Sequence, residues 1–252
     1  MSHEKAFGEL RSVLQKTPSL RAWYKVCRIL ERWPQGSLRE VALPYFKANI
    51  AHSEWAGARR PAPTRWAQSY LAGEKADYFE LIDGFDIEGI AVSPHQIARL
   101  VASPITQGLV SISLVEAELS HSALDILFSA HLPALRILDL SKNSLGGAIH
   151  ELPKASFRAQ LEQLRLRDSE FENEDLENLL KERFDHLEQL DLRGNRLGEK
   201  GIDLLSGNKN LPSLRALGLS DNTNIPETCD MGELTNIIYS HFPSAPDDFE
   251  VF

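Results

Sequence analysis

The sequence is poor in the residues that build covalent or metal-held scaffolds. It contains two cysteines, Cys27 and Cys229, among 252 residues, too few for a disulfide framework or a thiolate metal site. Its eight histidines are not grouped at the spacings typical of metal ligands. We therefore expect a fold held together by packing, with no metal and no cofactor.

Long apolar runs are also missing. No stretch of about eighteen consecutive apolar residues is present, as a membrane-spanning helix would need, and the first residues are charged where a secretory signal would have its apolar core. With 42% hydrophobic and 25% charged residues, the composition is that of an ordinary soluble globular protein. These features predict a cytoplasmic protein without membrane contact, while export by a route that uses no such signal stays an alternative.

A basic excess and catalytic motifs are absent as well. The net charge of −9 and the pI near 5.4 argue against a nucleic-acid partner. The sequence lacks the common phosphate-binding, dinucleotide-binding, zinc-protease and nucleophile-elbow motifs. The acids Glu172, Glu174 and Asp175 resemble the first turn of a helix more than a general acid and base. We expect a protein partner and no enzymatic activity.

What the sequence does contain is an internal repeat of the form L-x-x-L-x-L-x-x-N-x-L. Successive copies start at a nearly constant step, a regularity that is hard to produce by chance. Three copies keep the asparagine at the ninth position and three degenerate copies replace it. The copies start at Ile82, Leu109, Leu135, Leu161, Leu187 and Leu214, and their ninth residues are Ile90, Ala117, Asn143, Ser169, Asn195 and Asn222.

The segments between these strand-like motifs carry a second pattern. In three copies the apolar residues follow helical spacing, for example Leu176, Leu179, Leu180 and Phe184. Each repeat is therefore predicted to be strand, turn and helix, and stacked repeats share one core with their strands in parallel. The third repeat contains two glycines and Pro153 in this segment, which favour a loop or a short 3₁₀ turn.

Asparagine at the ninth position suits the turn that leaves the strand, because its side chain both accepts and donates hydrogen bonds. Ile90, Ala117 and Ser169 cannot do this fully. We expect their turns to be irregular.

These motifs resemble the leucine-rich-repeat family, over residues 80 to 242. The segment NRLGEKGIDLL, from Asn195 to Leu205, is similar to the helical, ribonuclease-inhibitor-like subclass, and bacterial cytosolic members are the nearest in character. The resemblance implies an α/β leucine-rich-repeat solenoid of about six strand-turn-helix repeats with a curved parallel sheet. It also implies binding through the concave sheet, although the fold alone does not fix a function.

The remaining parts flank the repeats. We expect an N-terminal helical cap at 1–75, the solenoid with a final capping helix at 76–242, and an acidic tail at 243–252. Helices are predicted at Ala6–Leu14, Leu20–Trp33 and Leu38–Ile50, and a short one begins at Trp66 after a proline-rich loop. The four tryptophans of this region are interpreted as packing residues, with a Trp-lined docking groove as the alternative. The tail is interpreted as frayed, or as a short peptide that a partner recognises.

The strand residues that alternate with the leucines point away from the core together and form the predicted binding face. Arg165 lies between Asp139 and Asp191 on neighbouring strands, either as part of a charge ladder or as a partner contact. Arg167 and Arg193 have no obvious acid beside them and are predicted anchors for an acidic group. The full set of candidate residues is Ile137, Asp139, Gln163, Arg165, Arg167, Gln189, Asp191 and Arg193.

The sequence thus predicts a non-enzymatic scaffold that holds a protein partner on its sheet. A regulator of an enzyme or GTPase, acting as inhibitor or activating protein, is the first alternative. A host-directed bacterial effector is the second. The identity of the partner and the oligomeric state are not encoded in any pattern we find.

Overall fold

The computed structural model describes residues 2–34, 36–206, 208–222 and 250–251. The chain divides into two compact units, Met1–Asp86 and Ile87–Phe252. The dividing point falls within the first strand, β1 (Gly84–Glu88). The predicted C-terminal capping helix around Leu234–Phe242 lies outside the described residues, as do Cys229 and most of the acidic tail.

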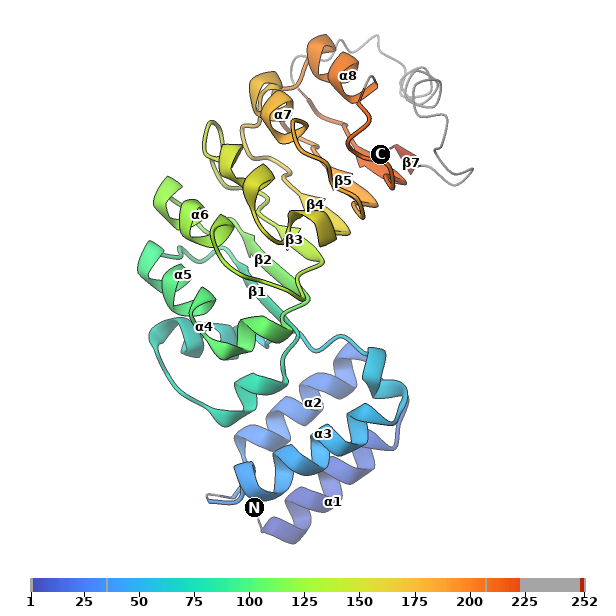
Figure 1. Ribbon diagram of the computed structural model, residues 1–252. Coiled ribbons are helices and arrows are strands. Elements are labelled where there is room, and N and C mark those ends of the chain that lie inside the picture. Colours follow the sequence, from blue (N-terminus) through green and yellow to red (C-terminus); the bar gives the residue numbers. More distant parts are fainter. Residues whose placement is uncertain (1, 35, 207, 223–249, 252) are drawn as a thin grey trace. The chain divides into compact units, whose positions relative to one another are not determined.

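The first unit is helical, as its apolar spacing predicts (Figure 1). Ser2 and Ser19 cap the first two helices by accepting backbone N–H bonds, which satisfies donors that a helix start leaves open. The elements are α1 (His3–Leu14), α2 (Leu20–Glu31), the π-helical turn η1 (Leu38–Ala42), α3 (Leu43–Ala51), η2 (Glu54–Gly57), α4 (Thr64–Ala72) and η3 (Asp77–Leu81).

The third predicted helix differs in its first turn, which is π-helical. Pro44 has no N–H to donate to the carbonyl of Glu40, and the N–H of Leu43 donates to the carbonyl of Leu38, five residues back. The missing donor gives a physical reason for the wider turn.

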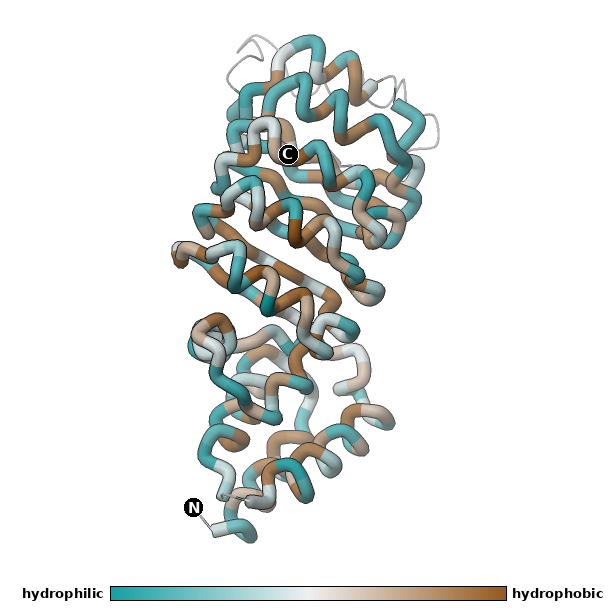
Figure 2. The backbone as a smooth tube through the Cα atoms, turned by 60° about the vertical axis from the view of Figure 1, so that its left-hand side comes forward, coloured by the Kyte–Doolittle hydropathy of each residue, from teal (hydrophilic) through white to brown (hydrophobic). Residues whose placement is uncertain are grey.

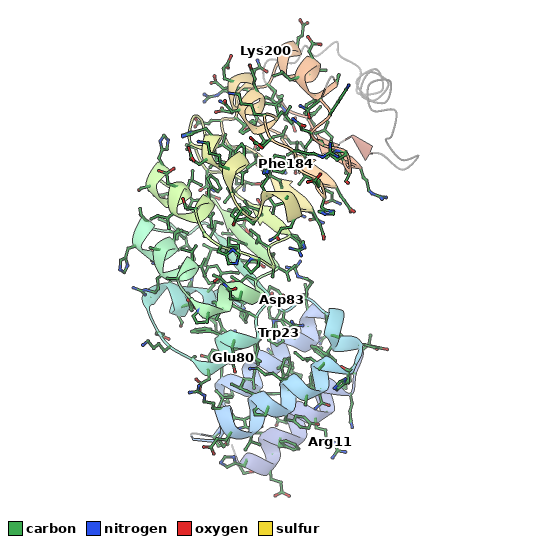
Figure 3. All side chains as sticks on the ribbon, viewed as in Figure 1. Arg11, Trp23, Glu80, Asp83, Phe184 and Lys200 are labelled. Atoms are coloured by element: carbon green, nitrogen blue, oxygen red, sulfur yellow. The ribbon has the colours of Figure 1, made fainter. Side chains whose placement is uncertain are left out.

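All four tryptophans belong to the core of the first unit, where Trp33 is 7% exposed. Trp23, Trp55 and Trp66 are at most 2% exposed. The Trp23 ring N–H donates to the carbonyl of Pro61 at 2.7 Å, and the Trp55 ring N–H donates to that of Lys16 at 3.2 Å. Packing is therefore their role, because buried rings cannot line an open groove; Figure 3 shows Trp23 inside the unit.

A buried ion pair fixes the end of the first unit. Asp83 accepts from the backbone N–H of Arg60 at 2.6 Å, and the Arg60 guanidinium lies 3.4 Å from the other carboxylate oxygen. The same guanidinium donates to the carbonyls of Leu81 and Ala58. The carboxylate, the guanidinium, the Arg60 backbone N–H and the two carbonyls are thus satisfied together.

The repeats form one sheet whose strand order follows the chain. Neighbouring strands from β2 to β6 are parallel, and equivalent leucines face one another: Leu138 pairs with Leu164, and Leu164 with Leu190. This confirms the predicted adjacent rungs. The strands are β2 (Ser111–Val115), β3 (Ile137–Asp139), β4 (Gln163–Arg165), β5 (Gln189–Asp191), β6 (Ala216–Gly218) and β7 (Glu250–Val251).

Strand β7 was not predicted. It lies in the segment interpreted as a frayed tail or a recognition peptide, and it pairs in parallel with β6.

The helices of the second unit lie on one side of this sheet and succeed one another in the order of the strands (Figure 1). A 3₁₀ turn replaces the helix of the third repeat, as its glycines and proline predict, and it contacts both α6 and α7. Apolar and polar residues alternate along the backbone (Figure 2). The elements are α5 (Pro94–Val101), η4 (Pro104–Gly108), α6 (His121–Phe128), η5 (Ile149–Lys154), η6 (Arg158–Gln160), α7 (Asn173–Leu179) and α8 (Glu199–Ser206).

Each repeat leaves its strand through a residue in the left-handed backbone region. Glycine adopts this conformation freely, whereas other residues lose about 1–2 kcal/mol. The residues, with φ between 51° and 67°, are Gly89, Glu116, Lys142, Asp168, Gly194 and Asp221.

Asparagine at the ninth position joins each turn to the preceding repeat, which confirms its predicted role. The Asn143 Oδ1 accepts from the backbone N–H groups of Ala117 (3.0 Å) and Leu119 (3.2 Å). Its Nδ2 donates to the carbonyls of Leu114 (2.7 Å) and Leu140 (2.8 Å). Asn195 makes the equivalent four bonds two repeats later.

Turns without asparagine use the backbone in place of the side-chain oxygen. The N–H of Val92 donates to the carbonyl of Ala117 at 2.9 Å, and the N–H of Leu145 donates to the carbonyl of Ser169 at 3.1 Å. Val92 and Leu145 are equivalent in their repeats to Leu119, whose N–H donates to the side-chain oxygen of Asn143.

Each turn in which a backbone carbonyl replaces the asparagine oxygen contains a second left-handed residue. Glu118 and Glu170, which directly follow Ala117 and Ser169, have φ of 48° and 57°. The predicted irregularity is thus confirmed for these two turns. For Ile90 the irregularity stays a prediction, and Ala91 is not among the residues with positive φ.

Candidate functional site

The sheet surface opposite the helices carries the predicted binding residues in two rows, which we call the open sheet face. One row holds Ile137, Gln163 and Gln189, and the other holds Asp139, Arg165 and Asp191; each row is in register across β3, β4 and β5. Arg167 and Arg193 follow two positions beyond β4 and β5. The structure therefore brings all eight predicted residues onto neighbouring strands.

Arg193 is held by Asp191 on its own chain segment. Its Nε donates to the Asp191 Oδ1 at 2.8 Å and its Nη2 donates to Oδ2 at 2.5 Å, a two-point contact between planar groups. The Arg193 backbone N–H also donates to Oδ1. The expectation that Arg193 has no acid beside it is therefore wrong, because residues two apart on a strand share a face.

Arg167 also has an acidic neighbour, contrary to expectation. Its Nε lies 3.0 Å from the Asp168 Oδ2. Asp168 is the left-handed residue of its turn, with φ of 51°. In a regular strand adjacent residues point to opposite faces, so it is the turn that brings this carboxylate beside Arg167.

Arg165 lies between two aspartates, as predicted, but it is paired with one of them. Asp191 stands opposite it in the register, yet both oxygens of Asp191 accept from Arg193. The Arg165 Nη1 is 3.6 Å from the Asp139 Oδ2, and Nη2 donates to the Gln163 side chain at 2.9 Å.

The arginines stay accessible whereas two of their aspartates are largely covered. The Arg165, Arg167 and Arg193 side chains are 42%, 48% and 30% exposed, against 13% for Asp139 and 10% for Asp191. The aspartates thus act as counter-ions beneath guanidinium groups that face solvent.

A glycine on β6 leaves room for this ion pair. A Cβ on Gly218 would lie 2.6 Å from the Asp191 Oδ1 and 3.1 Å from the Arg193 Cγ. Any larger residue at 218 would push against the pair.

The ion pair determines the protonation of both partners. Burial opposes ionisation of Asp191, but hydrogen bonds from the Arg193 side chain and backbone outweigh it, so the pKa of Asp191 lies below its ordinary value. The hydrogen bond to Asp191 raises the pKa of Arg193. Asp191 therefore stays an ionised acceptor at neutral pH.

Asp168 is the member of the open sheet face that sequence reasoning missed. It follows Arg167 directly and lies in the turn, where its side-chain direction cannot be read from strand alternation. A signal was available in the repeat: Gly89 and Gly194 occupy the same position in other copies, which marks it as left-handed.

Metal binding and membrane insertion would each need a distinct arrangement of residues. In the part of the chain that the structure describes, no cluster of three or more His, Cys, Asp or Glu residues is arranged to hold a metal ion. Within the same residues, no helix combines the length and apolar character needed to cross a lipid bilayer.

Comparison with known families agrees with the repeat analysis. The model of the Leucine Rich Repeat family matches residues 186–208, which comprise β5, its asparagine turn and α8. This match supports a leucine-rich-repeat family and, with it, a role in protein–protein interaction. A comparison with curated proteins finds none that matches the chain.

Proposed function

We propose that this protein is a non-enzymatic scaffold that binds a partner protein on the open sheet face of β3, β4 and β5. The observation that carries the proposal is the group of three partly exposed arginines on two neighbouring repeats, each beside an aspartate. Arginine is enriched in protein interfaces because its planar donors contact both polar and apolar groups.

The ion pairs favour binding because they fix the arginines in advance. A flexible arginine loses roughly 0.5–1.5 kcal/mol of side-chain freedom when it becomes ordered in an interface. Arg193, held at two points by Asp191, has already lost part of that freedom. Its side chain stays 30% exposed, so acceptor groups of a partner can reach the guanidinium.

The same chemistry makes this face a poor place for catalysis. A general acid or base works best with a pKa near the operating pH. The pKa of Asp191 is shifted away from neutrality, because Arg193 stabilises its ionised form. We therefore infer binding and not turnover.

The finer fold assignment belongs with this proposal. We infer a leucine-rich-repeat solenoid of the helical, ribonuclease-inhibitor-like subclass, acting in the cytoplasm. Support comes from the nearly constant repeat step and from the helix that follows most strands.

The test is affinity capture from a lysate of the source organism, comparing the wild type with Arg167→Glu/Arg193→Glu. The matched control is Lys181→Glu/Lys209→Glu, which makes the same charge change at exposed positions after α7 and α8. We expect a partner that the wild type and the control retain and the first variant loses.

A second variant separates loss of contact from damage to the sheet, because a glutamate in place of Arg193 would repel Asp191. Gln189→Trp adds bulk at an exposed position of the open sheet face that makes no ion pair within the described chain. It should also lose the partner while unfolding at the wild-type urea concentration. Retention of every captured protein by both variants would show that the proposed face is wrong.

A further inference from the structure

The first unit has a net positive charge, although the whole chain has a net negative charge. Residues 1–86 contain 13 Lys and Arg against 10 Asp and Glu, a net charge of +3, whereas residues 87–252 contain 14 against 26, a net charge of −12. The partner chemistry expected from the whole chain therefore does not apply to this unit.

Four of the cations lie on one face of helix α2. Arg21, Lys25, Arg28 and Arg32 follow one another at steps of four, three and four residues, which places them on one side of a helix. All four are exposed. Within the described chain no ion pair or side-chain hydrogen bond involves any of them. From the first to the last, the row extends about 16 Å.

The acidic residue of the same helix does not neutralise this row. Glu31 is the only acid in α2, and its Oε1 accepts from both the Arg65 guanidinium and the Trp66 ring N–H. Glu31 is therefore paired with Arg65 and does not pair with the four cations of the row.

Two open grooves lie on either side of Arg28, which lines both. One has a volume of about 430 Å³ and lies between α1 and α2; the other, of about 530 Å³, lies between α2 and the start of α4. The first is lined by Lys5, Glu9, Lys25, Arg28, Ile29 and Arg32. The second is lined by Tyr24, Arg28, Pro63, Thr64, Arg65 and Gln68.

The row also has an apolar border. Leu20 and Tyr24 precede Arg28 at steps of four residues on the same helix and are 52% and 39% exposed. Among the described residues they belong to a group of three large exposed hydrophobic side chains, with Val41 as the third, and all three lie in the first unit. A partner that covers the cations would cover Leu20 and Tyr24 as well.

We propose that the exposed face of α2 binds an acidic peptide segment of a partner protein, with carboxylates on the cations and an apolar side chain against Leu20 and Tyr24. Charge complementarity and the mixed lining of the grooves support this occupant. A nucleic acid fits less well, because a unit charge of +3 is small for a phosphate backbone. A membrane surface fits less well, because the apolar border of α2 is two residues long. This surface belongs to the first unit and the open sheet face to the second, so the two proposals are tested by different variants and either can fail alone.

The test is fluorescence anisotropy with a labelled peptide of about twelve residues, mostly glutamate with leucines interspersed, long enough to span the row as a helix. A lysine peptide of equal length, a single-stranded oligo-dT and phosphatidylserine vesicles serve as competing probes. We expect saturable binding of the glutamate peptide to the full-length protein, weakened by raising the salt concentration.

The decisive variant is Lys25→Glu/Arg28→Glu/Arg32→Glu, which should weaken the glutamate peptide about tenfold or more. The matched control, Arg11→Glu/Lys16→Glu/Arg39→Glu, makes the same charge change elsewhere in the unit, and Figure 3 labels Arg11. Circular dichroism confirms that both are folded. Equal weakening in both triple variants, absence of peptide binding, or tighter binding of oligo-dT or vesicles would overturn the proposal.

Discussion

Truncation of a buried asparagine is the sharpest perturbation of the repeats. Asn143 is 3% exposed, and Asn143→Ala removes the acceptor of two backbone N–H groups and the donor to three carbonyls. An unsatisfied buried group costs about 1–3 kcal/mol. With two N–H groups as the main loss, we expect destabilisation of about 3 kcal/mol.

The turns at Ala117 and Ser169 show how the Asn143→Ala variant can regain an acceptor for the N–H of Leu119. If Ser144 adopts a left-handed conformation, as Glu118 and Glu170 do, the carbonyl of residue 143 can accept the N–H of Leu119. Glycine adopts that conformation without the cost of a side chain. Ser144→Gly should therefore restore about 1 kcal/mol in the Asn143→Ala background.

The assay is urea unfolding of the wild type, both single variants and the double variant, followed by far-ultraviolet circular dichroism. All four tryptophans lie in residues 1–86, so tryptophan fluorescence follows the first unit as an internal reference. The double-mutant cycle isolates the coupling because the exposed Ser144 hydroxyl is removed in both backgrounds. An identical effect of Ser144→Gly in both backgrounds would refute the idea that the carbonyl of residue 143 replaces the asparagine side chain as acceptor. A loss below about 1 kcal/mol for Asn143→Ala would refute the stabilising role of the asparagine hydrogen bonds.

Three further changes test other parts of the structure. Gly194→Ala should lower the free energy of unfolding by about 1–2 kcal/mol in urea titrations, because φ is 67° and the new Cβ would meet the Asp168 carboxylate; an unchanged midpoint would contradict this. The lowered pKa of Asp191 means that its ion pair stabilises the fold above about pH 4 and is lost as pH falls through the folded pKa. Urea midpoints from about pH 6 down to about pH 2.5 should thus fall less for Asp191→Asn than for the wild type, and parallel curves would show that the pair contributes nothing. Arg60→Ala removes the less exposed of the two guanidinium groups beside the buried Asp83 and leaves Arg59, whose Nε lies 3.7 Å away; it should cost about 1–3 kcal/mol in tryptophan-monitored unfolding, whereas an unaltered transition would show that Asp83 does not depend on Arg60.

The repeat pattern predicted the sheet because it is redundant. Strand position, parallel register and the asparagine turn each recur at a fixed step, so Leu138, Leu164 and Leu190 could be aligned from the sequence alone. The short 3₁₀ segment containing Pro153 was predictable for a different reason, since glycine and proline act locally.

The ion pairs of the open sheet face could not be predicted from the repeat. Strand alternation gives the face on which a side chain lies but not its rotamer. Asp191 was one of two acids that could pair with Arg165 in the charge-ladder alternative, and it binds Arg193 on its own segment instead. Asp168 reaches Arg167 because a left-handed turn changes its direction. That the segment 1–75 caps the repeats stays a prediction.

The most direct test of partner binding on the open sheet face is site-specific photo-crosslinking. A benzophenone amino acid is placed at Gln163 or Gln189 on the sheet, or at Glu177 on α7, and each variant is irradiated in the presence of the captured partner. We expect covalent adducts from the two sheet positions and none from the helix position. Adducts from Glu177 alone would contradict binding on the sheet.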